Sequence, residues 1–220
     1  MPNVATCLMM LATLAALCVP LPAAKAEIIS KTSYKRHEVY GTTPAALISS
    51  MNRRSIPRAG SEVVMGLLEM EQDFSYEPIE TAQSCRVGSL KTRMDFTIIL
   101  PHARSRNRFD HDTRRLWRLF VAKVKHHKLT HRRYFLAYAN RYEARAKQVS
   151  EPTCAKVDTR LAEIAAEEYD RAQHQNEELD RHDGARVDDL PLFVAARHGP
   201  EIAENDDRIA MTRRRCLGAD

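Results

Sequence analysis

The most regular pattern of apolar positions lies in the second half of the chain. From residue 116 to residue 142, aliphatic and aromatic residues and two histidines recur at steps of three or four, the spacing of one face of an α-helix: Leu116, Phe120, Val124, His127, His131, Phe135, Tyr138 and Tyr142. Asp110 or Asp112 can cap such a helix, and Glu151-Pro152 ends it. We therefore expect one long helix that reaches to about Val149.

A second helical pattern follows directly. It starts at Thr153 or Cys154, continues to about Leu179, and carries its apolar residues on one face: Val157, Leu161, Ile164 and Ala165. After Asp183 the sequence is typical of loop and tail.

The first half has the composition of β-strands. Tyr34 to Gly41, Val63 to Tyr76 and Cys85 to Leu100 are rich in β-forming residues. We expect the last of these segments to contain two strands, with a turn near Gly88-Ser89 or Leu90-Lys91, and to stop at Pro101.

One short helix interrupts these strands. Thr43 can cap it, Pro44 fits its first turn, and Leu47, Ile48 and Met51 fall at helical spacing. Together the patterns predict an α+β fold, a small antiparallel sheet packed with two long helices.

The N-terminus has the pattern of a secretion signal. Cys7 to Val19 is apolar apart from Thr13, and Ala24-Lys25-Ala26 offers small residues for a cut before Glu27. We expect residues 1–26 to be a signal peptide, 27–185 a single domain, and 186–220 a loop and basic tail. The alternative is an anchor that stays attached. No later segment is apolar for long enough to cross a membrane, so a periplasmic or secreted location is expected.

Charge and cysteines refine this picture. With Lys25 removed, the net charge is 34 − 1 − 29 = +4, which by itself selects no partner. Cys85, Cys154 and Cys216 remain after the cut, so an oxidising compartment favours one disulfide and one spare thiol. Cys85 in a strand and Cys154 at a helix start form the preferred pair; three free thiols are the alternative, and the fate of Cys216 stays open.

The two histidines of the long helix are the candidate chemistry. His127 and His131 stand at i and i+4 on the core-facing stripe, the spacing by which one helix offers two nitrogens to one zinc ion. They can equally be satisfied core residues. Two histidines are also an incomplete site, since catalytic zinc takes three protein ligands and structural zinc four.

The chain resembles the bacterial secreted family catalogued as domain of unknown function 922, whose members are described as predicted zinc-dependent proteases. The resemblance runs from about Tyr34 to Pro191 and rests on the order of several segments: Tyr40-Gly41-Thr42-Thr43 with Ala46-Leu47 and Met51-Asn52, Cys85-Arg86-Val87 with Leu100-Pro101, Trp117, Phe120 and Val124 ahead of His127, and Cys154 with the acidic helix after it. It implies a zincin-like metallopeptidase fold, a zinc cofactor, and a protein or peptide substrate.

The chain departs from the family at its His-Glu-x-x-His motif. It reads His127-Lys128-Leu129-Thr130-His131, so Lys128 occupies the position of the glutamate that acts as general base on the attacking water. The resemblance implies a third ligand in Asp180-Arg181-His182-Asp183-Gly184, for which His182 is the first candidate and His174 the second. We therefore expect an exported member of the family with a degenerate catalytic site, its metal held by His127, His131 and His182.

A dense set of basic residues suggests a different class of function. Only Asp110 and Asp112 interrupt it: Arg104, Arg106, Arg108, Arg114, Arg115, Arg118, Lys123, Lys125, Lys128, Arg132 and Arg133. Such a run is usually the solvated face of an amphipathic helix, but it can also bind an anionic component of the cell envelope. The alternative function is therefore a non-enzymatic envelope or secreted binding protein on the same scaffold; nucleic acid is not an expected partner of an exported protein.

Overall fold

The computed structural model describes residues 25–56 and 65–198. The elements in chain order are β1 (Lys25–Val39), α1 (Pro44–Arg53), β2 (Leu67–Glu80), β3 (Cys85–Ala103), the 3₁₀ turn η1 (Arg106–Arg108), α2 (His111–Ala146), β4 (Ser150–Glu151), α3 (Cys154–Gly184), the 3₁₀ turn η2 (Val187–Asp189) and α4 (Pro191–His198). Apart from Lys25 and Ala26, the expected signal peptide lies outside the described residues, as do Cys216 and the basic end of the tail.

The sheet is mixed, and the expectation of a purely antiparallel sheet is corrected in this respect. Its strand order is β1-β3-β2, with β1 parallel to β3, β2 antiparallel to β3, and β4 paired to the first residues of β3. β2 and β3 form a hairpin that leaves one edge of β3 free. β1 pairs with that edge and runs parallel to β3. The alternation of apolar residues along a strand does not indicate whether its pairing is parallel or antiparallel.

β3 is one continuous strand of 19 residues, where two strands were expected. Gly88 does not turn the chain; it lies against β2, where a Cβ at this position would be 2.6 Å from Ile79 Cγ1. The register of β2 against β3 shifts between Glu77 and Pro78, which leaves Gly88 of β3 without a partner residue in β2. Pro101 does not end the strand either, because β2 pairs with β3 only up to Ile99 and position 101 has a neighbour on the β1 side alone.

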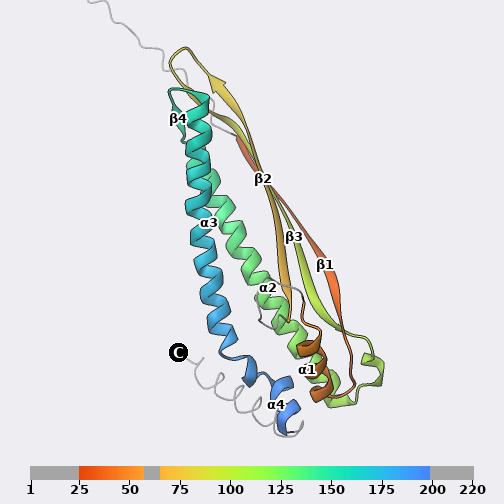
Figure 1. Ribbon diagram of the computed structural model, residues 1–220. Helices are drawn as coiled ribbons and strands as arrows, with labels where there is room; N and C mark the ends of the chain where they lie inside the picture. The colour runs from red at the N-terminus through yellow and green to blue at the C-terminus, as the bar shows by residue number, and fades with distance from the viewer. Residues whose placement is uncertain (1–24, 57–64, 199–220) are drawn as a thin grey trace, which may run out of the picture.

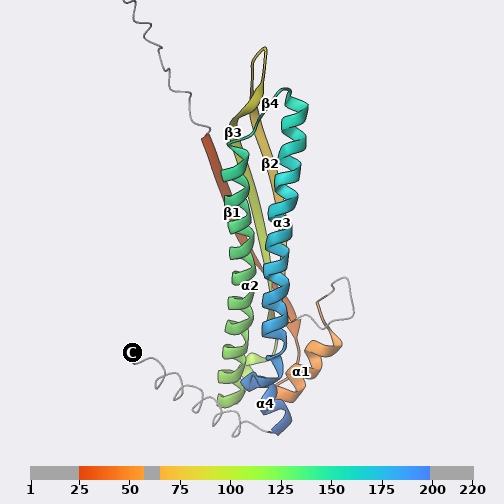
Figure 2. The same cartoon turned by 90° about the vertical axis from the view of Figure 1, so that its left-hand side faces the viewer.

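The two long helices cover one face of this sheet, so the described chain forms an elongated two-layer molecule (Figures 1 and 2). The fold class is the expected α+β. Met94, Phe96 and Ile98 of the central strand are almost fully buried beneath the helices, and Tyr138 of α2 is buried with them. A second apolar cluster, around Leu47, joins α1 and α4 to the first half of α2.

The predicted helix starts are confirmed by their caps. The Thr43 hydroxyl accepts a hydrogen bond from Ala46 N at the start of α1, and the Asp110 carboxylate accepts one from Thr113 N at the start of α2. α3 extends to Gly184, five residues beyond the expected end near Leu179, and the segment expected to be loop and tail contains α4. No helix within residues 25–56 and 65–198 has the length and apolar character needed to span a bilayer.

The preferred disulfide is confirmed. Cys85 at the start of β3 is bonded to Cys154 at the start of α3, with their Cα atoms 5.0 Å apart. The bond fixes one end of α3 to the sheet, which sets where the rest of α3 lies against α2.

Candidate metal centre

The candidate centre lies at the interface of the antiparallel helices α2 and α3. The histidine-bearing stripe of α2 faces α3 as its periodicity predicts: the side chain of His131 is 7% exposed and that of His127 is 14% exposed. α3 presents a matching stripe at helical spacing, which begins with apolar residues and ends with polar ones: Val157, Leu161, Ile164, Glu168, Ala172, Asn176, Asp180 and Asp183.

Three potential ligand atoms converge where the two stripes meet. His127 Nε2 is 2.9 Å from His131 Nε2, and Asp180 Oδ1 is 2.9 Å from the first and 3.0 Å from the second. Within the described part of the chain, these three side chains form a group of His and Asp that could hold a metal ion.

The opposite nitrogen of each imidazole has an oxygen partner. His127 Nδ1 lies 2.8 Å from Asp183 Oδ2, and His131 Nδ1 lies 2.7 Å from Asn176 Oδ1. Each of these oxygens accepts a hydrogen bond when the ring proton is on the neighbouring Nδ1. Without a bound cation, an Nε2–H can donate to Asp180 Oδ1; in the tautomer with the proton on Nδ1, two Nε2 lone pairs and the carboxylate oxygen face one another. A positive charge between them stabilises such an arrangement.

The spacing of these atoms fits a zinc ion. Zinc binds nitrogen and carboxylate oxygen at about 2.0–2.2 Å, so tetrahedral geometry separates its ligand atoms by about 3.3 Å. The observed separations of 2.9–3.0 Å are within a few tenths of an ångström of this value. The oxygen partners of His127 and His131 are also those typical of metal-bound histidine. Two histidines with one carboxylate are the ligand set of a three-ligand zinc site that keeps one position open.

Asp180 stays ionised in this environment. Partial burial raises the pKa of its carboxyl, but hydrogen bonds to His127 and His131 and the charge of Lys128 lower it further than burial raises it, so the pKa lies well below its ordinary value. Its side chain is 40% exposed, which leaves the centre open to solvent on this side. The carboxyl of Asp183, which also interacts with Lys123, likewise has a lowered pKa.

Lys128 lies beside the centre on the side of the sheet. Its side chain passes Gly66 at the start of β2, where a Cβ would be 3.9 Å from Lys128 Cε and only 2.5 Å from Val124 Cγ1. The absence of a side chain at residue 66 therefore allows α2 to approach the sheet here. The charge of Lys128 acts on Asp180, as expected for a residue at this position of the motif.

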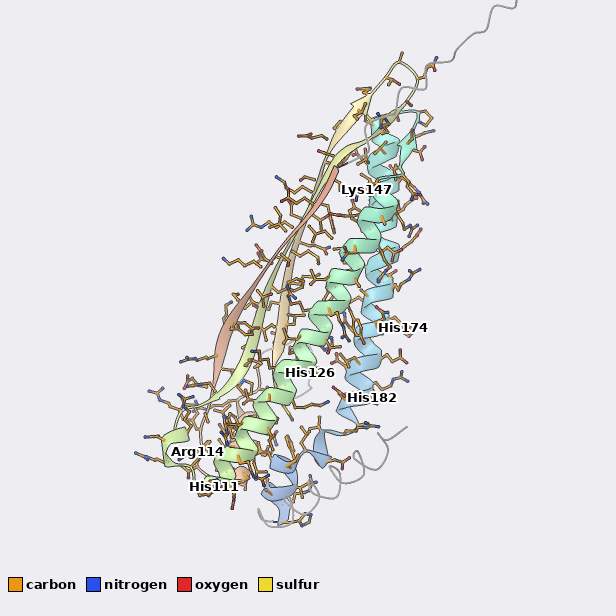
Figure 3. All side chains as sticks on the ribbon, turned by 180° about the vertical axis from the view of Figure 1, so that it is seen from behind. His111, Arg114, His126, Lys147, His174 and His182 are labelled. Carbon is orange, nitrogen blue, oxygen red and sulfur yellow. A yellow bond between two sulfur atoms is a disulfide. The ribbon has the colours of Figure 1, made fainter. Side chains whose placement is uncertain are left out.

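The structure does not bring His182 or His174 into the group of ligand atoms. His182 is 59% exposed at its side chain, and its Nδ1 lies 3.3 Å from Asp183 Oδ1. Figure 3 shows both residues on α3, with His174 farther from the end of the helix. His182 instead lines an open hollow of about 650 Å³, together with Tyr134 of α2 and four further residues of α3: Gln175, Glu178, Leu179 and Arg181.

The fold and the centre define an α+β protein with a two-histidine, one-carboxylate group between two antiparallel helices. The chain belongs to the family described as bacterial protein of unknown function, domain of unknown function 922, whose model matches residues 34–186. The family resemblance is thereby confirmed, and the matched range includes every residue of the centre. Comparisons with curated proteins and with solved structures give no match.

Proposed function

We propose that the protein is an exported zinc-binding member of this family, with a peptidase-like metal centre whose hydrolytic activity is strongly reduced. His127, His131 and Asp180 would hold the ion, and His182 would not be needed as a ligand. The observation that supports this proposal is the convergence of their three ligand atoms at 2.9–3.0 Å, with both Nδ1 atoms engaged elsewhere. A zinc ion bound there would supply Lewis acidity.

The residues around the centre have separate roles in this proposal. Asp183 and Asn176 hold the two imidazoles in the ring orientation that directs Nε2 toward Asp180. Lys123, 3.4 Å from Asp183, balances part of the negative charge. The hollow lined by Tyr134 and Arg181 would receive part of a polypeptide.

Strongly reduced hydrolysis follows from Lys128. An ammonium group cannot accept the proton of an attacking water, and α2 contains no Asp or Glu between Asp112 and Glu143 that could replace the lost carboxylate. Loss of a general base typically lowers the rate by about 10²–10⁴-fold. The Cys85–Cys154 disulfide is compatible with an extracellular location and supports export.

Elemental analysis of protein purified without chelator tests the proposal. We expect about one zinc ion per chain, lost in His131→Ala, and little cleavage of an unfolded protein substrate by the wild type. If neither zinc nor another first-row divalent cation binds, the metal centre is refuted. If the wild type cleaves rapidly and His131→Ala does not, the loss of catalysis is refuted while the metal centre stands.

A further inference from the structure

A row of cations follows the flank of α2 that lies next to β1. Lys125 Nζ is 5.2 Å from the centre of the Tyr34 ring, and Arg132 Nη2 donates a hydrogen bond to Ser30 Oγ at 3.3 Å. Arg118 precedes Lys125 by seven residues and so lies on the same side of the helix. We call Arg118, Lys125 and Arg132 the basic row. Figure 2 shows α2 between β1 and α3, so the row and the metal centre occupy different sides of α2.

No carboxylate of the described chain neutralises the basic row. Other cations of α2 form ion pairs with α3: Lys123 with Asp183, and Arg141 and Arg145 with Glu168. Within residues 25–56 and 65–198, Arg118, Lys125 and Arg132 form no ion pair, and Arg132 Nε is buried with no hydrogen-bond partner. Solvated helix faces ordinarily alternate both signs of charge at i and i+4. This flank therefore has the charge complementary to an acidic partner.

The neighbouring edge of β1 is open along its length. β1 pairs with β3 in unbroken register from Lys25 to Val39, and the described residues provide no strand on its other side. Tyr34 of β1 is 52% exposed, whereas Ile98, its register partner in the central strand, is fully buried.

The opposite edge of the sheet is interrupted, whereas the register of β1 is regular. β2 contains Pro78 and a register shift next to it, both of which protect an edge. β2 is also acidic, with no Lys or Arg: Glu69, Glu71, Asp73, Glu77 and Glu80. The two edges thus differ in both geometry and charge, and the basic, regular edge is the one beside the basic row.

We propose that β1 and the basic row bind an extended acidic polypeptide segment, which adds to the sheet as a further strand. An added strand lies about 4.8 Å from its neighbour and hydrogen-bonds to its free backbone groups. Every second side chain of that strand would project on the helix side, next to Lys125 and Arg132. A lipid surface or a polyphosphate would use the cations alone, whereas a polypeptide uses the cations and the strand edge. The proposal is independent of the metal centre.

Binding of a labelled peptide to the purified protein tests the proposal. The probe is an alternating glutamate–threonine peptide of about ten residues, followed by fluorescence anisotropy. We expect saturable binding that Arg118→Glu with Lys125→Glu weakens by at least about tenfold. Arg106→Glu with Arg108→Glu makes the same change in net charge outside the row, and we expect it to change the affinity by less than about twofold. A peptide that is N-methylated at every second amide has no N–H donors along one of its edges. It should therefore fail to bind to the edge of β1.

Four results would overturn the proposal. The first is no binding by the wild type. The second is an equal loss in both double variants, which would indicate general charge attraction. The third is unchanged binding of the N-methylated peptide, which would exclude strand addition. The fourth is tighter binding of a DNA oligonucleotide or of phosphatidylglycerol vesicles with the same dependence on Arg118 and Lys125. All four residues are exposed, so neither pair of substitutions should disturb folding, and circular dichroism verifies this for each variant.

Discussion

Substitution of Asp180 tests which residue is the third ligand. The structure places Asp180 next to His127 and His131, whereas the sequence motif suggests His182. Asp180→Ala removes the only oxygen among the three converging ligand atoms, whereas His182→Ala removes a side chain that lies outside the group. We expect zinc to stabilise the wild type and His182→Ala to the same extent, and Asp180→Ala far less. The two variants are a matched pair, since they lie on the same helical turn and both remove a polar side chain.

The size of the effect follows from linkage. At a zinc concentration 100 times Kd, binding raises the free energy of unfolding by about 2.7 kcal/mol. For a chain of this size that raises Tm by about 5–11 °C. Loss of an outer hydrogen-bond partner of a metal site lowers affinity by about 10–100-fold, so loss of a ligand should lower it by at least about 100-fold. At the same zinc concentration the stabilisation then falls to about 0.4 kcal/mol, or about 1–2 °C.

Differential scanning fluorimetry with and without zinc measures this difference. The shift on adding zinc is compared within each variant, so that a change in the stability of the metal-free protein cancels. A full shift in Asp180→Ala together with its loss in His182→Ala would refute the geometry and favour His182 as the third ligand. No shift in the wild type at any zinc concentration would refute the centre as a whole.

Three further predictions concern separate features. Lys128→Glu replaces a cation next to the centre by an anion, so zinc affinity in a competition assay with a chromogenic chelator should rise by at least about tenfold; an unchanged affinity would show that Lys128 does not act on the ion. Cys85→Ser with Cys154→Ser opens a loop with a sequence separation of 69 residues and should lower the free energy of unfolding by about 4 kcal/mol, measured by urea denaturation; a loss below about 1 kcal/mol would contradict it. Burial raises the pKa of the Glu168 carboxyl, but hydrogen bonds from Arg141 and Arg145 outweigh burial and the pKa lies below its usual value. Its contribution to stability is therefore complete above the unfolded pKa of about 4.3 and is lost as pH falls through the folded value. Glu168→Gln should therefore flatten the acid limb of stability against pH; an acid limb as steep as that of the wild type would assign it to other carboxylates.

The helices and their contacts could largely be predicted from periodicity. The stripe that includes His127 and His131 faces α3 as its spacing requires, and Asp110 and Thr43 cap the helices that they precede. Both patterns depend on residues close together in sequence. Strand pairing depends on distant residues, and nothing in β1 alone indicates that Lys25 pairs with Ser89 in a parallel ladder.

Asp180 was not predicted as a member of the candidate group because the second long helix was predicted too short. Because the helix was expected to end near Leu179, Asp180 was not assigned to a helix face. The third ligand was instead chosen from the histidine motif of the family. Extending the stripe of Val157 and Leu161 by steps of three and four through Asn176 reaches Asp180 and Asp183 on the face opposite His127. The helical spacing therefore already indicated that Asp180 and Asp183 face His127. The sequence from Thr153 to Asp183 contains no proline or glycine that would end the helix earlier.

If the chain is cut before Glu27, the position of β1 imposes an order on that cut and on folding. Lys25 and Ala26 are the first two residues of β1 and pair with Ser89 and Leu90. A peptidase needs its substrate extended and unpaired, so a cut before Glu27 in the folded protein would require these pairs to open. Formation of β1 also waits for β3, which is synthesised more than 60 residues later, and pairings of such long range form slowly. A cut at this position is therefore expected before β1 pairs with β3. If cleavage were delayed, the leader would remain attached to a strand that is already paired.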